Sequence, residues 1–173
     1  MIDLKKIQDL IQIRINSSSE NLPKHVLVSL SDFSNSKEKE KLKETLKKIT
    51  EIINKQIKLK IPLLTISLGK DFSNIDQDTF FNYLDSTLPE LTNENKIRTS
   101  FIGKWYSVQG MVVEAIKKII KDTREYDNLF LNFCINYDGQ EEILDATRVM
   151  IRKIYDKQLD PDSVDLKKIK ENI

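Results

Sequence analysis

Cysteine and histidine are almost absent from this chain of 173 residues, since each occurs once. A single cysteine, Cys134, cannot form a disulfide within the chain, and no Cys/His cluster is available to hold zinc. Cys134 stands inside an apolar segment, so we expect a buried structural thiol. The single histidine, His25, opens a strand-like segment without recognisable serine and acid partners, which argues against a catalytic triad.

An excess of one charge and long apolar runs are also missing. Lys and Arg total 28 against 27 Asp and Glu, which gives a formal net charge of +1. This balance argues against nucleic acid binding, which normally requires a basic excess. No stretch approaches the roughly 18 apolar residues of a membrane span, and residues 1–6 lack a signal-peptide pattern. We expect a cytosolic protein that reaches a membrane surface only peripherally, through a partner.

Short apolar segments alternate with amphipathic ones along the chain. The strand-like segments are residues 25–30, 62–68, 96–102 and the start of 128–151. Helical spacing follows over 37–56, 78–91 and 112–120, in the second half of 128–151, and over 161–173 with Asp160 as its cap. Such alternation predicts a single α/β domain with a mainly parallel central sheet and helices on both faces.

The first residues form a separate part of this pattern. The pattern predicts a leading helix and a polar loop over residues 1–20, and the α/β domain over residues 21–173. The leading helix is too short to be stable alone, so we expect it to dock on this chain or on a partner.

Ligands of open α/β sheets bind beyond the carboxyl ends of the strands, so the loops there were compared. In the loop 31–36, Asp32 could bind a Mg²⁺ that carries phosphates, and Asn35 could hydrogen-bond phosphate oxygens. The alternative is that Asn35 or Ser36 only caps the next helix. Lys70 in the loop 69–74 could face a phosphate or belong to an ordinary turn.

The two remaining loops follow the third and fourth strands. Residues 103–107 hold the only tryptophan, and a helix cap at Ser107 with an aromatic lid explains them without a ligand. The turn 136–139 precedes a helix that carries Glu141 and Glu142. The chain has neither a glycine-rich phosphate loop nor a dinucleotide fingerprint. These residues by themselves indicate an α/β domain without identifying a reaction.

Three blocks resemble the cis-prenyltransferases, the undecaprenyl and dehydrodolichyl diphosphate synthase family. They are "NLPKHVLVSL", then "IRTSFIGKW" followed by "VVEAIKKIIKDTREYDNLFLNFCINYDGQEEILDATR", and finally "KQLDPDSVDLKKIKENI". The resemblance spans residues 21–173, and the leading helix looks most like archaeal and eukaryotic members. Members of the family condense isopentenyl diphosphate onto an allylic diphosphate with Mg²⁺.

The resemblance fails at the family's catalytic positions. The family's first strand ends in Asp-Gly-Asn-x-Arg-Trp-Ala, whereas here Ser31 stands at the aspartate, Asp32 follows one place late and Phe33 replaces the glycine. No arginine follows, and Lys37 is a poor substitute for its fixed fork. Asp32 and Asn35 are therefore only remnant catalytic candidates, and Asp32 is a weak metal candidate.

The later motifs of the family are also changed. The second strand should lead into Ser-x-Glu-Asn-Trp-x-Arg but leads into residues 69–74, which leaves Lys37, Lys70 and Asn74 as substrate-binding candidates. The chain ends before the family's Arg-x-Gly-Gly-Glu segment, so the resemblance implies a domain without its C-terminal active-site segment. The family's counterpart of the helix 78–91 lines a prenyl tunnel. The tunnel candidates, for which simple core filling is the favoured alternative, are Phe80, Phe81, Tyr83 and Leu84.

Other positions match the family pattern as scaffold. These structural matches are His25, Gly103, Thr123, Asn132, Asn136, Tyr137, Gly139 and Glu142. We expect Asn136 and Tyr137 to hold the strand–helix turn in place, although Asp138 and Gln140 stand where the family has glycine and arginine.

The resemblance implies a non-catalytic accessory subunit of a heteromeric cis-prenyltransferase that makes long-chain polyprenyl diphosphate, the precursor of a dolichol- or undecaprenol-type carrier. Its partner would be a paralogous catalytic subunit that holds the Mg²⁺, and no cofactor is expected on this chain. It would act through partner stabilisation or chain-length control, with prenyl diphosphate as a further ligand. The alternatives are an active prenyltransferase with a rebuilt site, or a stand-alone binder of prenyl lipids or phosphates.

Overall fold

The structure, a computed structural model, describes residues 22–30, 39–70, 72 and 75–170. The chain divides into two compact units, one that runs to Asn136 and one that begins at Tyr137. The predicted leading helix and the loop 31–36 lie outside the described residues.

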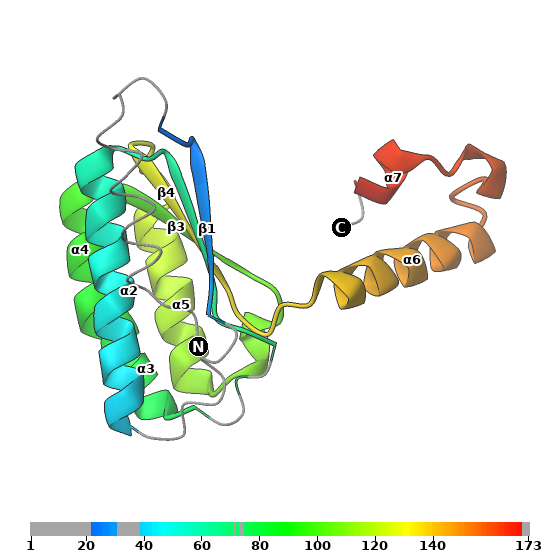
Figure 1. The fold of residues 1–173 in the computed structure, drawn as a ribbon. Coiled ribbons are helices and arrows are strands. Elements are labelled where there is room, and N and C mark those ends of the chain that lie inside the picture. Colours follow the sequence, from blue (N-terminus) through cyan, green and yellow to red (C-terminus); the bar gives the residue numbers. More distant parts are fainter. Residues whose placement is uncertain (1–21, 31–38, 71, 73–74, 171–173) are drawn as a thin grey trace. The chain divides into compact units, whose positions relative to one another are not determined.

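The first unit is built on four parallel strands (Figure 1). They are β1 (His25–Ser29), β2 (Leu63–Ser67), β3 (Ile97–Ile102) and β4 (Leu129–Cys134). Their order in the sheet is β1-β2-β4-β3, so the last strand lies between the second and the third. The predicted α/β class, the parallel sheet and the positions of all four strands are confirmed.

Helices join the strands of this unit. They are α2 (Lys39–Leu59), α3 (Gln77–Asn82), the π-helix η3 (Tyr83–Thr87), α4 (Leu88–Asn95), the 3-10 helix η4 (Trp105–Ser107) and α5 (Gly110–Thr123). The single helix predicted over 78–91 is therefore interrupted. Pro89 has no N–H for an α-helical hydrogen bond, and the Leu88 N–H before it donates to the Tyr83 carbonyl, five residues back.

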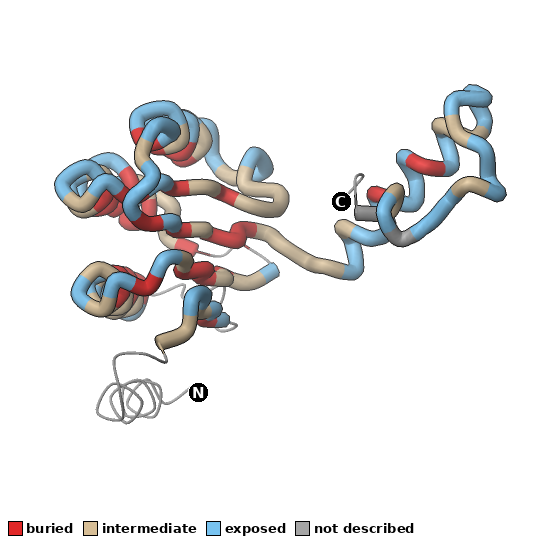
Figure 2. The backbone as a smooth tube through the Cα atoms, turned by 90° about the horizontal axis from the view of Figure 1, so that it is seen from above, coloured by how far each residue is buried: buried red, intermediate tan, exposed pale blue. Residues whose placement is uncertain are grey.

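The core lies between these helices and one face of the sheet (Figure 2). Ile66 of β2 pairs with Phe133 of β4 in register, and both side chains are buried because alternate strand residues point to this face. On the opposite face Leu27 is 62% exposed. Among the described residues of this unit, helices cover only one face of the sheet (Figure 1). The prediction of helices on both faces is therefore confirmed for one face of the sheet in this unit.

A buried amide joins the two layers of the core. The Gln56 side chain, near the end of α2, donates through Nε2 to the Ile61 carbonyl at 3.1 Å and to the Phe130 carbonyl at 3.0 Å. Gln56 is only 2% exposed. A polar side chain is tolerated there because it satisfies carbonyls that water cannot reach.

The second unit consists of α6 (Gly139–Tyr155), the 3-10 helix η5 (Pro161–Ser163) and α7 (Leu166–Lys170). The predicted cap is confirmed, because Asp160 Oδ1 accepts from the Asp162 N–H at 3.0 Å. The prediction of one helix from 161 onward is wrong. Val164 is extended, and Asp165 Oδ1 accepts from the Lys168 N–H at 2.8 Å to begin a new helix. No described helix is long and apolar enough to cross a membrane.

Candidate functional site

The loops that follow β3 and β4 meet at the carboxyl edge of the sheet. The Lys104 N–H donates to the Asn136 carbonyl at 3.4 Å, and Asn136 Nδ2 donates to Ser107 Oγ at 2.8 Å. Ser107 Oγ in turn donates to the Lys104 carbonyl at 2.6 Å. The prediction that Ser107 caps the next helix is therefore wrong, since its hydroxyl closes the loop, and α5 begins only at Gly110.

The loops after β3 and β4, which together form a corner of the sheet, each contain a residue in the left-handed backbone conformation. Gly103 has a φ of 90° and Asn136 a φ of 48°, a region that glycine adopts freely and asparagine more readily than most residues. Asn136 Oδ1 is buried and has no hydrogen-bond partner among the described residues. The corner thus holds the two strand ends together, and its polar atoms are mostly turned toward one another.

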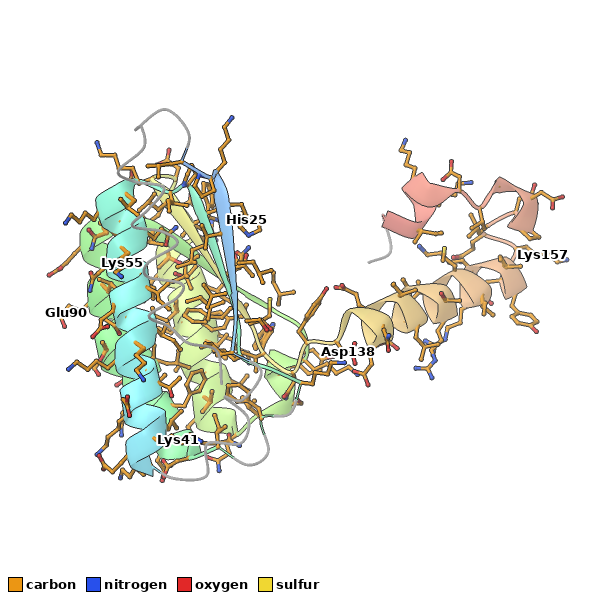
Figure 3. The ribbon with its side chains drawn as sticks, viewed as in Figure 1. His25, Lys41, Lys55, Glu90, Asp138 and Lys157 are labelled. Atoms are coloured by element: carbon orange, nitrogen blue, oxygen red, sulfur yellow. The ribbon has the colours of Figure 1, made fainter. Side chains whose placement is uncertain are left out.

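The beginning of α6 has its own polar contacts. Tyr137 Oη donates to Glu142 Oε2 at 2.8 Å. Asp138, labelled at the start of α6 in Figure 3, accepts through Oδ1 from the Gln140 N–H at 3.0 Å as the helix cap. A Cβ at Gly139 would lie 3.6 Å from Tyr137 Oη, an ordinary contact. Glu142 is therefore engaged with the turn rather than directed to a ligand, and position 139 would accommodate a Cβ.

Three more of the matched scaffold residues make contacts across the sheet. His25, labelled on β1 in Figure 3, has Nε2 2.9 Å from Thr65 Oγ1, and Asn132 Nδ2 donates to the same oxygen at 3.4 Å. Thr123 at the end of α5 accepts from the Thr99 N–H at 3.1 Å. These contacts join neighbouring strands, and a strand to a helix.

The proposed tunnel residues lie in or against the core. Phe80 and Leu84 are each 1% exposed, and Phe80 contacts Phe72 edge to face with ring centroids 5.1 Å apart. Phe81 is partly buried against the same cluster. This packing is the one expected if these side chains fill core. Burial also raises the pKa of Tyr83 to about 12.

The remnant catalytic and substrate-binding candidates are mostly not placed. Asp32, Asn35, Lys37 and Asn74 lie outside the described residues, and Lys70 is exposed. Within the described ranges no three His, Cys, Asp or Glu side chains gather closely enough to hold a metal ion. The described donors therefore do not fit a Mg²⁺ site, and no step of a reaction is assigned to one.

The structure adds a cleft that the sequence reading missed. It has a volume of about 520 Å³ and lies between α2 and the α3–η3 segment. Lys39, Lys43 and Lys47 line it, together with hydroxyl and amide side chains of α3 and η3. The spacing of four between these lysines was visible in the sequence, but the facing wall comes from residues about 40 positions later and was not predictable from it.

Comparison with known families gives one model that covers most of the chain. The family described as "Putative undecaprenyl diphosphate synthase" matches residues 32–173. The match includes β2, β3 and β4 and the whole second unit.

Individual relatives match over shorter segments. The isoprenyl transferase of Bacillus subtilis is 32% identical over 83 residues, which cover 48% of this chain and 32% of the relative. A tritrans,polycis-undecaprenyl-diphosphate synthase (geranylgeranyl-diphosphate specific) of Archaeoglobus fulgidus is 28% identical over 106 residues, 58% of this chain and 42% of the relative. The chain thus matches between about a third and less than half of the length of these two relatives.

Solved structures share the fold. Lavandulyl diphosphate synthase from Lavandula x intermedia, solved with dimethylallyl diphosphate, gives a TM-score of 0.75 at 21% identity and covers 87% of this chain and 70% of its own. A probable undecaprenyl diphosphate synthase from Campylobacter jejuni gives 0.59 at 21% identity, with 88% and 70% covered.

Proposed function

The chain belongs to the undecaprenyl diphosphate synthase family of cis-prenyltransferases, and we propose that within this family it is a non-catalytic subunit of a heteromeric cis-prenyltransferase. Its partner is a paralogous catalytic subunit, and the complex makes a long-chain polyprenyl diphosphate. This chain contributes stability to the partner or sets the length of the product.

One observation carries the proposal, the contrast between scaffold and catalytic positions. The four described strands form a parallel sheet over a buried core. By contrast, Ser31 stands where the family pattern has its aspartate, Asp32 follows one place late, Phe33 replaces the glycine, and no arginine follows. Arginine clamps a diphosphate through two parallel hydrogen bonds, so its loss weakens both binding and the stabilisation of the departing charge.

In this proposal, Mg²⁺ binds only to the partner subunit. A bound Mg²⁺ would neutralise the diphosphate that leaves the allylic substrate. This chain's own part is to present a folded surface to the catalytic subunit, with peripheral membrane contact through the complex.

A second candidate is an active prenyltransferase with a rebuilt site. It is favoured by the names of the matched relatives, which are those of transferases and synthases. Asp32, Asn35 and Lys70 would then replace the usual diphosphate and metal contacts. The stand-alone binder of prenyl lipids or phosphates remains the third reading.

The test begins with purification of the tagged chain from its native cells. We expect a second family member, with the Asp-Gly-Asn-x-Arg motif intact, to co-purify in a fixed ratio. Removal of this chain should lower the partner's incorporation of labelled isopentenyl diphosphate or change the product length. Separate elution together with unchanged partner activity contradicts the proposal.

One variant separates the subunit from the rebuilt enzyme. The purified chain alone, with Mg²⁺ and an allylic diphosphate, should incorporate no label. In the complex, Asp32→Ala should leave incorporation unchanged if this chain is a non-catalytic subunit. Incorporation by the chain alone that disappears in Asp32→Ala identifies the rebuilt enzyme instead.

A further inference from the structure

The face of the sheet that the helices leave uncovered, the open face, carries an apolar cluster. Leu63 of β2 lies between His25 of β1 and Phe130 of β4 in the register of the strands, and Leu27 follows His25 on the same side. Leu27 is 62% exposed, Phe130 is 38% exposed, and Leu63 is half-buried. These three side chains, the open-face cluster, form a neighbouring apolar set toward the amino ends of three adjacent strands.

The strands have the composition of strands that are covered on both faces. β1, β2 and β4 read HVLVS, LLTIS and LFLNFC, so each carries apolar residues on both of its sides. Parallel sheets occur almost only with both faces covered, and their strands show this composition. Phe130 is exposed although β4 is an interior strand of the sheet. We therefore expect a further element of structure over the open face.

The polar side chains of the open face bind one another. His25 Nε2 lies 2.9 Å from Thr65 Oγ1, and Asn132 Nδ2 donates to the same oxygen at 3.4 Å. Thr65 is only 6% exposed. Because these groups already have partners, an apolar element can pack beside them without leaving a buried polar group unpaired.

The segment before β1 has apolar residues that suit this surface. Leu4, Ile7 and Ile11 recur at spacings of three and four, which places them on one side of the predicted leading helix. The polar residues on the opposite side are Lys5, Asp9 and Gln12. A helix of this length is marginal in water by itself, so its apolar side needs a surface to pack on.

The length of this segment and its point of attachment bring it to the open face. Residues 4–13 would form about 15 Å of helix, close to the roughly 17–20 Å length of a typical strand. Residues 14–24 lead to the amino end of β1, beside the open-face cluster. At about 3.3–3.6 Å per extended residue, they can cross strands spaced about 4.8 Å apart. A short tether also gives a local concentration on the order of millimolar, far above that of a separate chain in dilute solution.

We propose that residues 4–13 form an amphipathic helix that packs on the open face of the sheet. Leu4, Ile7 and Ile11 contact the open-face cluster, which gives the parallel sheet a second helical layer. The leading segment is then an integral part of the α/β domain, and a partner chain would contact other surfaces. This inference does not depend on the proposed subunit role.

Hydrogen exchange of the full chain at low micromolar concentration tests the packing. The amides of residues 4–13 should exchange at least about tenfold more slowly than in a synthetic peptide of residues 1–20, because packing protects a helix that is marginal by itself. About tenfold dilution should leave this protection unchanged. Protection that is lost on dilution would assign the open face to a second copy of the chain. That result, or fast exchange of these amides in the isolated chain, overturns the proposal.

Variants of the open face locate the contact. Phe130→Lys places a charge in the open-face cluster and should accelerate exchange of residues 4–13 at least about tenfold, since burying an unpaired ammonium is costly. Met111→Lys is the matched control, because Met111 is 47% exposed on α5, which packs on the other face. It should change the exchange less than about twofold. Should Phe130→Lys not fold, Leu27→Lys replaces it, because lysine is well tolerated on an edge strand.

Changes in the leading segment complete the test. Ile7→Lys keeps a good helix former and should lower Tm by about 4 °C or more, whereas Gln12→Lys on the polar side should lower it by at most about 1 °C. Ile7→Lys combined with Phe130→Lys should lower Tm no further than Phe130→Lys alone, because both remove the same contact. Additive losses of Tm, or exchange of residues 4–13 that neither Phe130→Lys nor Leu27→Lys accelerates, contradict the proposal.

Discussion

At the scale of single residues, Thr123 provides a hydrogen-bond acceptor for a backbone N–H at the edge of the sheet. β3 pairs only with β4 in the described sheet, so the Thr99 N–H on its other side has no neighbouring strand. Thr123 Oγ1 accepts from that N–H at 3.1 Å and donates to the Ile119 carbonyl at 2.8 Å. Because Thr123 is 1% exposed, water cannot replace it.

The isosteric change Thr123→Val should therefore lower the free energy of unfolding by about 1–3 kcal/mol, the usual cost of a buried unpaired donor. Thr147→Val is the matched control, since Thr147 makes the same helical contact, to Ile143 at 2.8 Å, but is exposed on α6. Urea denaturation measures both. An equal loss of unfolding free energy in the two variants would show that the contact between Thr123 and the Thr99 N–H does not contribute to stability.

Tyr83 gives the molecule a dependence on alkaline pH. Burial raises its pKa to about 12, against 10 for an ordinary tyrosine. The folded state thus keeps a proton that the unfolded state loses above pH 10, and stability falls as pH rises from 10 toward 12. Over this window the loss from Tyr83 amounts to about 2–3 kcal/mol.

The comparison with Tyr83→Phe isolates this effect. Near pH 8 the variant should be less stable by about 1 kcal/mol, because the contact with Thr50 is lost. Toward pH 12 that difference should shrink and reverse. Tyr155→Phe, at a position 84% exposed, is the control. A difference for Tyr83→Phe that stays constant with pH contradicts the prediction.

At the scale of elements, the α3–η3–α4 segment shows how a local signal fixes a helix start. Asp76 caps α3 and accepts from the Thr79 N–H at 2.8 Å, which lowers the pKa of the carboxyl. Asp76→Ala should lower the free energy of unfolding by about 1 kcal/mol. Asp78→Ala, an exposed acidic residue of the same turn, should cost less.

The pH dependence of this cap has the opposite sign to that of Tyr83. Because the folded-state pKa of Asp76 lies below the unfolded one, the contribution is complete above about pH 4 and is lost as pH falls through the folded pKa. Denaturation of wild type and Asp76→Ala at neutral and at acidic pH measures this. A difference that persists at low pH would mean that the uncharged carboxyl caps equally well.

At the scale of the whole molecule, charge contributes little to stability. The net charge is +1, and the helical ion pairs, such as Lys48–Glu44 at 2.6 Å and Arg148–Asp145 at 3.0 Å, are exposed to solvent. Exposed pairs are screened by salt and contribute little in any case. We expect the free energy of unfolding at low salt and in roughly 1 M sodium chloride to differ by at most about 1 kcal/mol. A larger decrease in urea titrations would reveal a charge network that these exposed pairs do not account for.

Much of the fold was predictable at this scale, and much less of the site. The four strands and the helices between them follow from period-two and helical spacing, which the chain carries locally. The π-turn at Tyr83 was missed because it depends on the hydrogen bonds around Pro89 rather than on hydrophobic spacing. The helix predicted from 161 was split because Asp165 supplies a second cap that competes with continuation of the first turn.

The sequence by itself determined the α/β class and the family, and it leads to the expectation that the usual catalytic pattern after the first strand is absent. Each of these depends on residue types at short spacings, which local backbone geometry converts directly into strands, helices and loops. Only the tertiary structure decided that β4 lies between β2 and β3, that Thr123 accepts from the Thr99 N–H at the edge of β3, and that Lys43 and Thr79 line the same cleft. These neighbours are far apart in the chain, and packing of the shared core brings them together.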